Sequence, residues 1–274
     1  MRKARIDAVL ADRGLFPSRS AAAGAVRAGE VRVGPDGPIA LRPSQLVDPE
    51  AELIVDPGPR FVSRGGVKLD NALRALGIEV AGRDCLDVGA STGGFTDCLL
   101  QRGAARVAAV DVAYGQLAAR LRDDPRVTVI ERRNARDLRP DELPFAPELA
   151  TIDVSFISLT KVLAAVAACL APGGEALAMV KPQFELGRER VGRGVVRDPA
   201  DRREAVLRVA LAARELGLAV RGFAPSGLPG PKGNLETFVH CGGDGPQLDD
   251  LEAAIAAADA AGEEAAARRR KKGR

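Results

Sequence analysis

Charged residues adjoin three of the apolar runs in the second half of the chain, where they could take part in chemistry. Asp153 and Lys181 each follow such a run, and Glu236 precedes another. Short apolar runs of this kind are typical of strands that a sheet buries on both faces. A lysine that emerges from a buried strand is costly unless it is paired or functional, so we expect carboxylates beside Lys181.

A second lysine, Lys68, lies in the segment Ser-Arg-Gly-Gly-Val-Lys-Leu, and we expect it before the first helix of its domain. A hydroxyl is a poor nucleophile until its proton is removed, and a lysine held neutral by burial and a nearby cation can remove it. Lys181 is the candidate base and Lys68 the second cation. Asp153 would orient Lys181, and Glu236 would hold Lys68 or the substrate. The alternative is an internal ion-pair network that stabilises the fold and catalyses no reaction.

A glycine-rich segment, Asp-Val-Gly-Ala-Ser-Thr-Gly-Gly-Phe at residues 87–95, follows the first of these apolar runs. Glycines at a strand-to-helix turn let a ligand approach the backbone closely, although they can also serve packing alone. The spacing differs from the GxGxxG of dinucleotide sites and from a P-loop. Asp111, at the end of the next strand, is placed to accept hydrogen bonds from a ribose diol, and Asn134 to lie near an adenine ring. The candidate cofactor-binding residues are Asp87, Gly89, Ala90, Ser91, Thr92, Gly93, Gly94, Phe95, Asp111 and Asn134.

Strands and helices alternate from residue 69 onward, which predicts a doubly wound α/β domain with a mostly parallel sheet. In such a sheet ligands bind beyond the carboxyl ends of the strands, where the charged residues above would meet. The expected strands are 84–89, 106–112, 126–131, 148–156 and 175–181, and the expected helices are 95–103, 115–124, 159–170 and 201–217.

The first 58 residues predict a small α/β unit of different character. Residues 5–15 and 18–29 are expected to form two short helices, with Ser18 as the N-cap of the second and Gly29 at its end. Residues 30–34 and 51–56 have the pattern of strands. Pro57, Gly58 and Pro59 then indicate a domain boundary.

Charge and aromatic content limit the function classes. The formal net charge is +3, but residues 268–274 carry six positive charges, which leaves about −3 for the rest of the chain. Such an end indicates a polyanionic partner or, alternatively, a disordered solubilising terminus. Aromatic residues make up only 3% and Trp is absent, so surfaces for base stacking should be scarce.

Cysteine spacing and apolar run length argue against a secreted, metal-binding or membrane protein. Cys85, Cys98, Cys169 and Cys241 form no CxxC pair, so we expect reduced core thiols, no metal site and a cytoplasmic location. The longest Ala-rich apolar run, residues 163–171, is far below the roughly 18 residues that span a bilayer. The N-terminal segment lacks the apolar core of a signal peptide.

Five segments in this order closely resemble the TlyA family of rRNA 2′-O-methyltransferases, whose members are often labelled hemolysins. They are residues 63–69, 87–95, 153–156, 180–184 and 233–236. The resemblance covers nearly the whole chain. It implies an S4 RNA-binding domain followed by an FtsJ-like class I methyltransferase domain with a mostly parallel seven-stranded sheet. It implies S-adenosyl-L-methionine as cofactor and cytidine riboses of 16S rRNA, 23S rRNA or both as acceptors. The family's catalytic tetrad falls on Lys68, Asp153, Lys181 and Glu236.

The resemblance also implies a division of the chain into domains and a set of RNA contacts. We expect an S4-like domain at 1–59, a linker at 60–63, a methyltransferase domain at 64–246, and an Ala-rich possible helix with a basic tail at 247–274. The linker could couple RNA docking to cofactor binding, in which case RNA raises the affinity for the methyl donor. The partner would be ribosomal RNA or a ribosomal subunit, with the chain most simply a monomer. The expected phosphate contacts, any one of which could be an ordinary solvated charge, are Lys3, Arg5, Arg19, Arg42, Arg64 and Arg132.

Four other functions compete with this interpretation. A pseudouridine synthase can carry an S4 domain but needs no cofactor loop, and a small-molecule or protein methyltransferase hardly needs the S4 unit. A non-catalytic S4-type ribosome-associated factor would tolerate loss of the lysine pair, which is present. A membrane-active hemolysin would need a membrane-active segment, and the sequence offers none. His240, the single histidine, lies within an expected strand and is interpreted as structural.

Overall fold

The computed structural model describes residues 3–27, 29–35, 37–55, 60–192, 194–230, 232–243 and 245–272. The chain divides into two compact units, residues 1–60 and 61–274. The predicted boundary signal at Pro57, Gly58 and Pro59 lies outside the described residues, as do the last two residues of the basic tail.

The first unit packs two short helices against short antiparallel strand pairs, β1 with β3 and β2 with β4. The second helix begins after Ser18, whose Oγ accepts the backbone N–H of Ala21 at 3.2 Å, and this confirms the predicted N-cap. Ile6, Leu10 and Val26 are fully buried between the helices and strands. The elements are β1 (Ala4–Arg5), α1 (Ile6–Asp12), α2 (Arg19–Arg27), β2 (Val31–Val33), β3 (Leu46–Val47) and β4 (Leu53–Val55).

The second unit is built on a sheet that has seven strands in the described part of the chain, in the order β10-β11-β9-β8-β5-β6-β7. Strands β5 to β9 are parallel to one another, and β11 runs antiparallel to both of its neighbours. The predicted mostly parallel α/β sheet is therefore confirmed. The strands are β5 (Asp84–Val88), β6 (Arg106–Val110), β7 (Val127–Ile130), β8 (Leu149–Ile152), β9 (Glu175–Val180), β10 (Val220–Pro225) and β11 (Thr237–Gly242).

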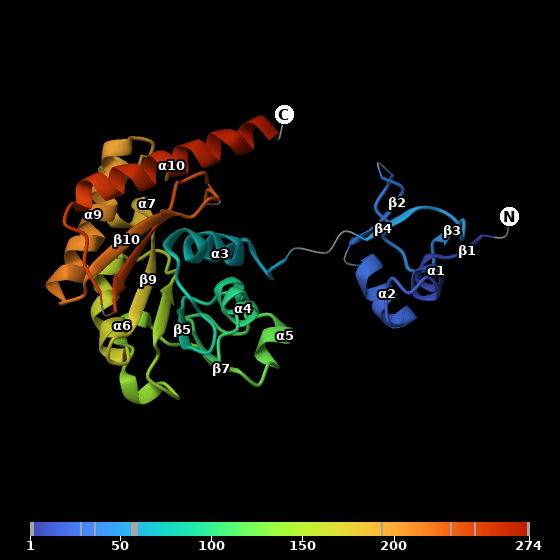
Figure 1. Cartoon of the computed structure of the whole chain (residues 1–274), viewed down its shortest axis with the longest axis horizontal. Helices are drawn as coiled ribbons and strands as arrows, with labels where there is room; N and C mark the ends of the chain where they lie inside the picture. The colour runs from blue at the N-terminus through green and yellow to red at the C-terminus, as the bar shows by residue number, and fades with distance from the viewer. Residues whose placement is uncertain are drawn as a thin grey trace. The chain divides into compact units, whose positions relative to one another are not determined.

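Helices cover both faces of this sheet (Figure 1). Alternate residues of one strand serve opposite cores: Leu86 packs with the core under α6, α9 and α10, whereas Cys85 packs with the core under α3 and α4. This double burial explains why the strands are almost continuously apolar. The helices are α3 (Arg64–Leu76), α4 (Gly94–Gln101), α5 (Ala119–Arg122), α6 (Leu163–Cys169), α7 (Pro182–Glu185), α8 (Arg188–Val191), α9 (Pro199–Glu215) and α10 (Leu251–Lys272), with 3-10 turns η1 (Ala135–Asp137), η2 (Pro140–Glu142) and η3 (Leu159–Lys161).

One prediction about the site was wrong: Lys68 lies within α3 and does not precede it. The Gly65–Gly66 pair suggests a break in the helix, yet the helix begins at Arg64 and runs through both glycines. A Cβ on Gly66 would overlap the Phe61 ring and approach the carbonyl oxygen of Gly94. The glycine therefore allows the first turn of α3 to pack directly against the glycine-rich loop at residues 89–94.

A buried ionic cluster joins the two long helices at the end of the chain. The Arg202 side chain of α9 donates to both carboxylate oxygens of Asp259 in α10, at 2.7 and 2.8 Å, and to Glu263 at 2.6 Å. Only 6% of the Arg202 side chain is exposed, so this pair is shielded from water. The cluster fixes α10 against α9.

Arg202→Ala should lower the free energy of unfolding by about 3 kcal/mol, because it leaves the Asp259 carboxylate buried without its cation. The control is Arg190→Ala, which removes an arginine that bridges Asp201 and Glu204 at a more exposed position. Its cost should be much smaller, because solvent screens that more exposed pair. Urea unfolding of the two variants compares them, and equal losses would show that the Arg202 cluster has no special role.

Candidate active site

Polar side chains from three parallel strands converge at the carboxyl edge of the sheet. Asp111 follows β6, Asp153 follows β8 and Lys181 follows β9, while the glycine loop begins directly after β5. Because the carboxyl ends of parallel strands share one edge, the topology gathers residues that are far apart in the sequence.

Two ion pairs contain all four predicted catalytic residues. Lys181 Nζ lies 2.6 Å from Asp153 Oδ1 and also donates to Ser155 Oγ at 2.8 Å. Lys68 Nζ donates to Glu236 Oε2 across 168 positions of sequence. Lys68 and Glu236 are buried, with 7% and 3% of their surface exposed, whereas the Asp153 side chain is 23% exposed. The site therefore has one buried pair and one that solvent can reach.

The two pairs form one electrostatic cluster. Burial raises the pKa of Glu236 above its usual range, while Lys68 and, at longer range, Lys181 oppose that shift and Asp153 adds to it. A change of charge at any one of these groups is therefore felt by the others.

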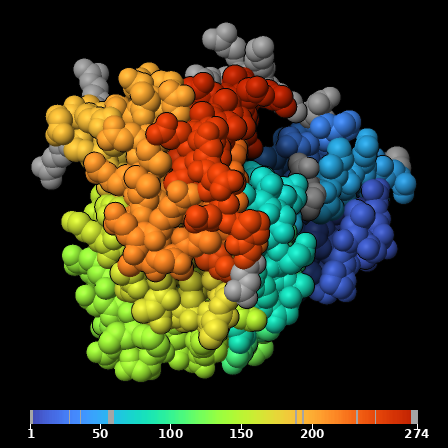
Figure 2. All heavy atoms as spheres, turned by 60° about the vertical axis from the view of Figure 1, so that its left-hand side comes forward, coloured from blue at the N-terminus to red at the C-terminus, as the bar shows by residue number. Residues whose placement is uncertain are grey.

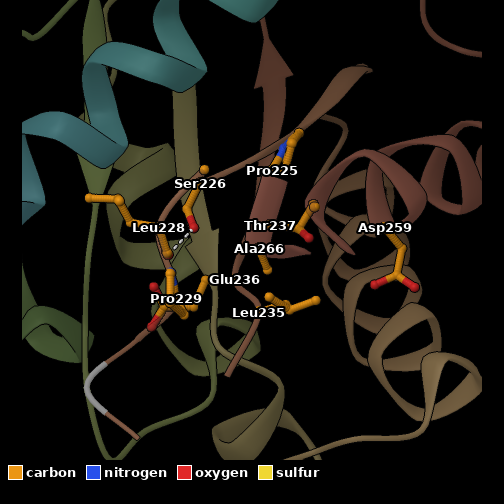
Figure 3. A pocket seen from close by; sticks show the side chains of 11 residues that line it. Pro225, Ser226, Leu228, Pro229, Leu235, Glu236, Thr237, Asp259 and Ala266 are labelled. Carbon is orange, nitrogen blue, oxygen red and sulfur yellow. Dashed lines mark hydrogen bonds between the residues drawn. The ribbon is translucent and has the colours of Figure 1, made fainter. Parts of the chain in front are cut away.

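The loop before β11 holds Glu236 in place through contacts with α3. Asn71 Nδ2 donates to the carbonyl of Ser226 at 3.0 Å, and Arg64 Nη2 donates to the carbonyl of Pro229 at 2.5 Å. The Ser226 N–H in turn donates to the Glu236 carbonyl at 2.9 Å. A Cβ on Gly230 would lie 2.6 Å from Glu236 Oε1, so the loop closes tightly over the carboxylate. Figure 3 shows Glu236 beside Leu228 and Pro229 of this loop.

The glycine loop lies against Asp153 on one side and Asp111 on the other. Gly89 has a φ of +87°, and a Cβ there would overlap the carbonyl of Asp153. Only glycine combines this left-handed conformation with so close an approach. Asp111 accepts the N–H of Ser91 through Oδ2 and that of Ala113 through Oδ1, both at 2.7 Å. The predicted ribose acceptor thus also fixes the loop.

Two adjoining clefts, of about 1050 and 450 Å³, open beside this loop and share Gly89, Ser91 and Asp153. The smaller also reaches Lys68. Of the predicted cofactor residues, Gly89, Ser91, Asp111 and Asn134 line the larger cleft, and Gly89, Ala90, Ser91, Thr92, Gly94 and Phe95 line the smaller. Asp87 and Gly93 line neither of these two clefts. A Cβ on Gly93 would overlap Leu121, so this glycine is needed for packing.

Asp87 lies fully buried beneath the loop. Its Oδ2 accepts the backbone N–H and the hydroxyl of Thr96 at 2.8 and 2.7 Å, while Oδ1 has no hydrogen-bond partner among the described residues. Burial raises the pKa of Asp87 to about 7; Thr96 opposes that shift, and the Asp153 and Asp111 carboxylates add to it. These acids favour a cationic ligand, and the sulfonium and ammonium groups of S-adenosylmethionine fit that requirement.

The structure distributes the predicted RNA-binding residues over both units. Arg5 and Arg19 both lie near the carboxylate of Asp7, at 2.7 and 3.5 Å, so part of their charge is neutralised. Arg132 has a φ of +58° and lies over the Tyr114 ring at 4.4 Å. Exposed positions also hold Lys3, Arg42 and Arg64.

Sequence reasoning missed an exposed aromatic residue at the larger cleft. Phe156 is 92% exposed, has a φ of +63° and packs its ring against Phe184 at 5.1 Å between centroids. A non-glycine residue rarely adopts this backbone conformation, so the surrounding structure must hold Phe156 in its exposed position. The position of Phe156 directly after the Asp-Val-Ser segment could have indicated its place at the cleft. The low aromatic content of the chain argued against a surface for base stacking.

Comparison with known proteins agrees with this geometry. A model of the FtsJ-like methyltransferase family matches residues 61–243, and an S4 domain model matches residues 4–53. The 16S/23S rRNA (cytidine-2′-O)-methyltransferase TlyA of Mycobacterium tuberculosis is 51% identical over 241 residues, covering 87% of this chain and 89% of the relative. This chain belongs to the TlyA family. The family resemblance predicted from the five segments is thus confirmed.

Two other relatives match over most of this chain. YqxC of Bacillus subtilis is 42% identical over 267 residues and covers 94% of both chains. A solved structure from Streptococcus thermophilus, 39% identical, covers 99% of both chains with a TM-score of 0.75. Among the described residues, no helix of this TlyA-family chain is long and apolar enough to cross a membrane, and no cluster of three metal-ligating side chains occurs.

The affinity for S-adenosylmethionine should rise as the pH increases through about 7, because Asp87 ionises there and attracts the cationic ligand. Binding only to the ionised form would improve the dissociation constant by up to about tenfold between about pH 6 and 8. Isothermal titration calorimetry across this range measures the effect. Asp87→Asn, which keeps an acceptor for Thr96, should remove this component; an unchanged pH profile in the variant would refute the assignment.

Proposed function

We propose that this chain transfers a methyl group from S-adenosylmethionine to the 2′-hydroxyl of a cytidine in 16S rRNA, 23S rRNA or both. The observation that carries the proposal is the pair of lysine–carboxylate contacts beside the glycine loop, with Lys181–Asp153 open to solvent. The match to a cytidine-2′-O-methyltransferase over most of both chains supports the acceptor.

S-adenosylmethionine, when bound, would supply a sulfonium methyl group to the ribose oxygen, with a neutral thioether as the leaving group. Lys181, in its unprotonated form, accepts the proton of the 2′-hydroxyl, so that the oxygen can form its new bond to carbon. Asp153 and Ser155 hold the Lys181 amine in position, within 2.6 and 2.8 Å. Correct placement of the oxygen and the methyl carbon contributes much of the rate.

The buried pair supports this reaction from the other side of the cluster. Lys68 provides a fixed positive charge near the oxygen that becomes negative, and such preorganised charge is effective where water is excluded. Glu236 holds Lys68 and balances its charge in the buried interior. Removal of Glu236 alone would therefore leave an uncompensated cation.

RNA recognition is divided between the S4 unit and the rim of the clefts. In the S4 unit, Arg5 at the end of β1 and Arg19 at the start of α2 lie together near Asp7 and would contact the phosphates of a folded RNA. Arg64 lines the smaller cleft and Phe156 the larger. A base stacked on the exposed ring of Phe156 would leave its ribose close to Asp153, three residues before it in the chain.

Transfer of a labelled methyl group to unmodified 30S subunits, 50S subunits and free rRNAs tests the proposal directly. The expected product is 2′-O-methylcytidine, and mapping identifies the subunit. Cofactor binding with no label in any of these RNAs, or label on a base, would contradict the proposed acceptor.

Lys181→Ala should abolish transfer while cofactor binding and the unfolding midpoint stay near those of the wild type. Lys181→Arg is the matched variant, because arginine keeps the positive charge but does not release its proton in proteins. Both should lower kcat by about 100-fold or more if Lys181 is the base. Substantial activity in the arginine variant would reduce Lys181 to an electrostatic role.

Phe156→Ala should weaken productive RNA binding by about 1–3 kcal/mol, the usual value for loss of one base–aromatic stack. The effect should appear in the KM for RNA, with the affinity for S-adenosylmethionine unchanged. Phe156→Tyr provides the control because it keeps the ring and should restore binding. Equal defects in both variants would indicate that the backbone of the loop matters and stacking does not.

A further inference from the structure

Helix α10 is a firmly docked element whose two ends differ in character. Leu251, Ile255 and Ala258 are buried, and Asp259 is held by Arg202 of α9. The helix packs against α9, β10 and β11. Figure 2 shows its red atoms as a ridge on the surface beside the orange atoms of the preceding segments, and in Figure 1 its C-terminal end projects past β10.

The C-terminal end of α10, residues 268–272, consists of five consecutive cations, Arg-Arg-Arg-Lys-Lys. Arg268 and Arg269 are exposed, and Arg268 Nη2 lies 3.3 Å from Glu264 Oε2. Glu263, the other acid of this stretch, is engaged by Arg202. Cations at a helix C-terminus are compatible with the helix dipole, so the helix can carry this charge to its end. Arg268 and Arg269 therefore present positive charge at the surface.

This basic end begins beside the loop before β11, which carries Glu236. Ala266 of α10 lines a small pocket together with Pro229, Leu235 and Glu236 (Figure 3). Arg268 follows two residues later, which is about 3 Å along the helix axis. Pro229 is also the residue whose carbonyl accepts the Arg64 guanidinium at the smaller cleft. Cations on two different elements thus flank the loop that carries Glu236.

We infer that the C-terminal end of α10 is a phosphate-binding surface that holds the acceptor RNA beside the active site. The inference rests on the proposed function, because it takes the polyanion to be the RNA that is methylated. A terminus that served only solubility would not need a buried ionic cluster to hold its helix in place. Docking by Arg202 and Asp259 instead places the start of the basic end, at Arg268 and Arg269, near the loop that carries Glu236.

The test compares neutralised variants in RNA binding as a function of salt. The probe is an unmodified rRNA stem-loop, measured by fluorescence anisotropy. R268Q/R269Q/R270Q/K271Q/K272Q should bind at least about tenfold more weakly, and the slope of log K against log salt should become shallower by about 2–4, as expected from loss of phosphate contacts. The S-adenosylmethionine affinity and the transfer rate at saturating RNA should remain those of the wild type.

The matched controls are R268Q/R269Q and R106Q/R126Q, which remove the same charge at different places. Arg106 and Arg126 are exposed at the amino edge of β6 and β7, opposite the active site. The first pair should weaken binding and flatten the salt slope, and the second should change neither beyond experimental error. Circular dichroism and urea unfolding of each variant verify that α10 stays folded.

Equal effects of the two double variants, or an unchanged slope in the fivefold variant, would overturn the inference. Binding of the wild type to vesicles of phosphatidylserine and phosphatidylcholine with no binding to the stem-loop would also overturn it, in favour of a membrane surface. A wild type that binds the RNA with the expected charge dependence but transfers no methyl group would contradict the proposed function and leave α10 as an RNA-binding surface.

Discussion

The arrangement of the active site depends on one buried ion pair, Lys68 with Glu236. Two charges removed from water are stable only when each holds the other in good geometry, so the elements that carry them must be kept together. Helix α3 supplies the lysine and the loop before β11 supplies the carboxylate. The contacts of Asn71 and Arg64 with that loop then follow as the means of keeping the two elements together. The pair ties the beginning of the methyltransferase unit to its last strand.

Close approach between backbones is the second constraint, and it explains the glycines around the cofactor loop. Gly66 lets α3 reach the Phe61 ring and the carbonyl of Gly94, and Gly89 lets the loop reach Asp153. Both contacts draw a lysine–carboxylate pair toward the same cleft. The shape of the loop therefore also brings it against Asp153, the ion-pair partner of Lys181.

Much of this could be predicted from the sequence, and the failures have physical causes. The Lys181–Asp153 ion pair was predictable because a lysine or acid at the end of a buried strand needs a partner, and the sheet edge provides one. The place of Lys68 inside α3 was not, since a glycine pair is locally a helix breaker and only its tertiary neighbours make the helix favourable. The exposure of Phe156 depends on one left-handed backbone angle, which an aromatic residue does not signal. Arg202 and Asp259 are 57 positions apart, and nothing in the spacing indicates that they meet.

The distribution of charge follows from the two ligands that the proposed reaction brings together. A cationic methyl donor requires acids at the loop, and Asp87, Asp111 and Asp153 supply them at close range. An RNA acceptor carries a dense negative charge that these same carboxylates would repel, so cations must surround the entrance. The chain places these charges at different depths: Asp87 is buried beneath the glycine loop, Asp111 and Asp153 line the larger cleft, and the exposed Arg64 lines the smaller cleft. A net charge of only +3 over 274 residues is then compatible with RNA binding, because the local field at the rim matters more than the total.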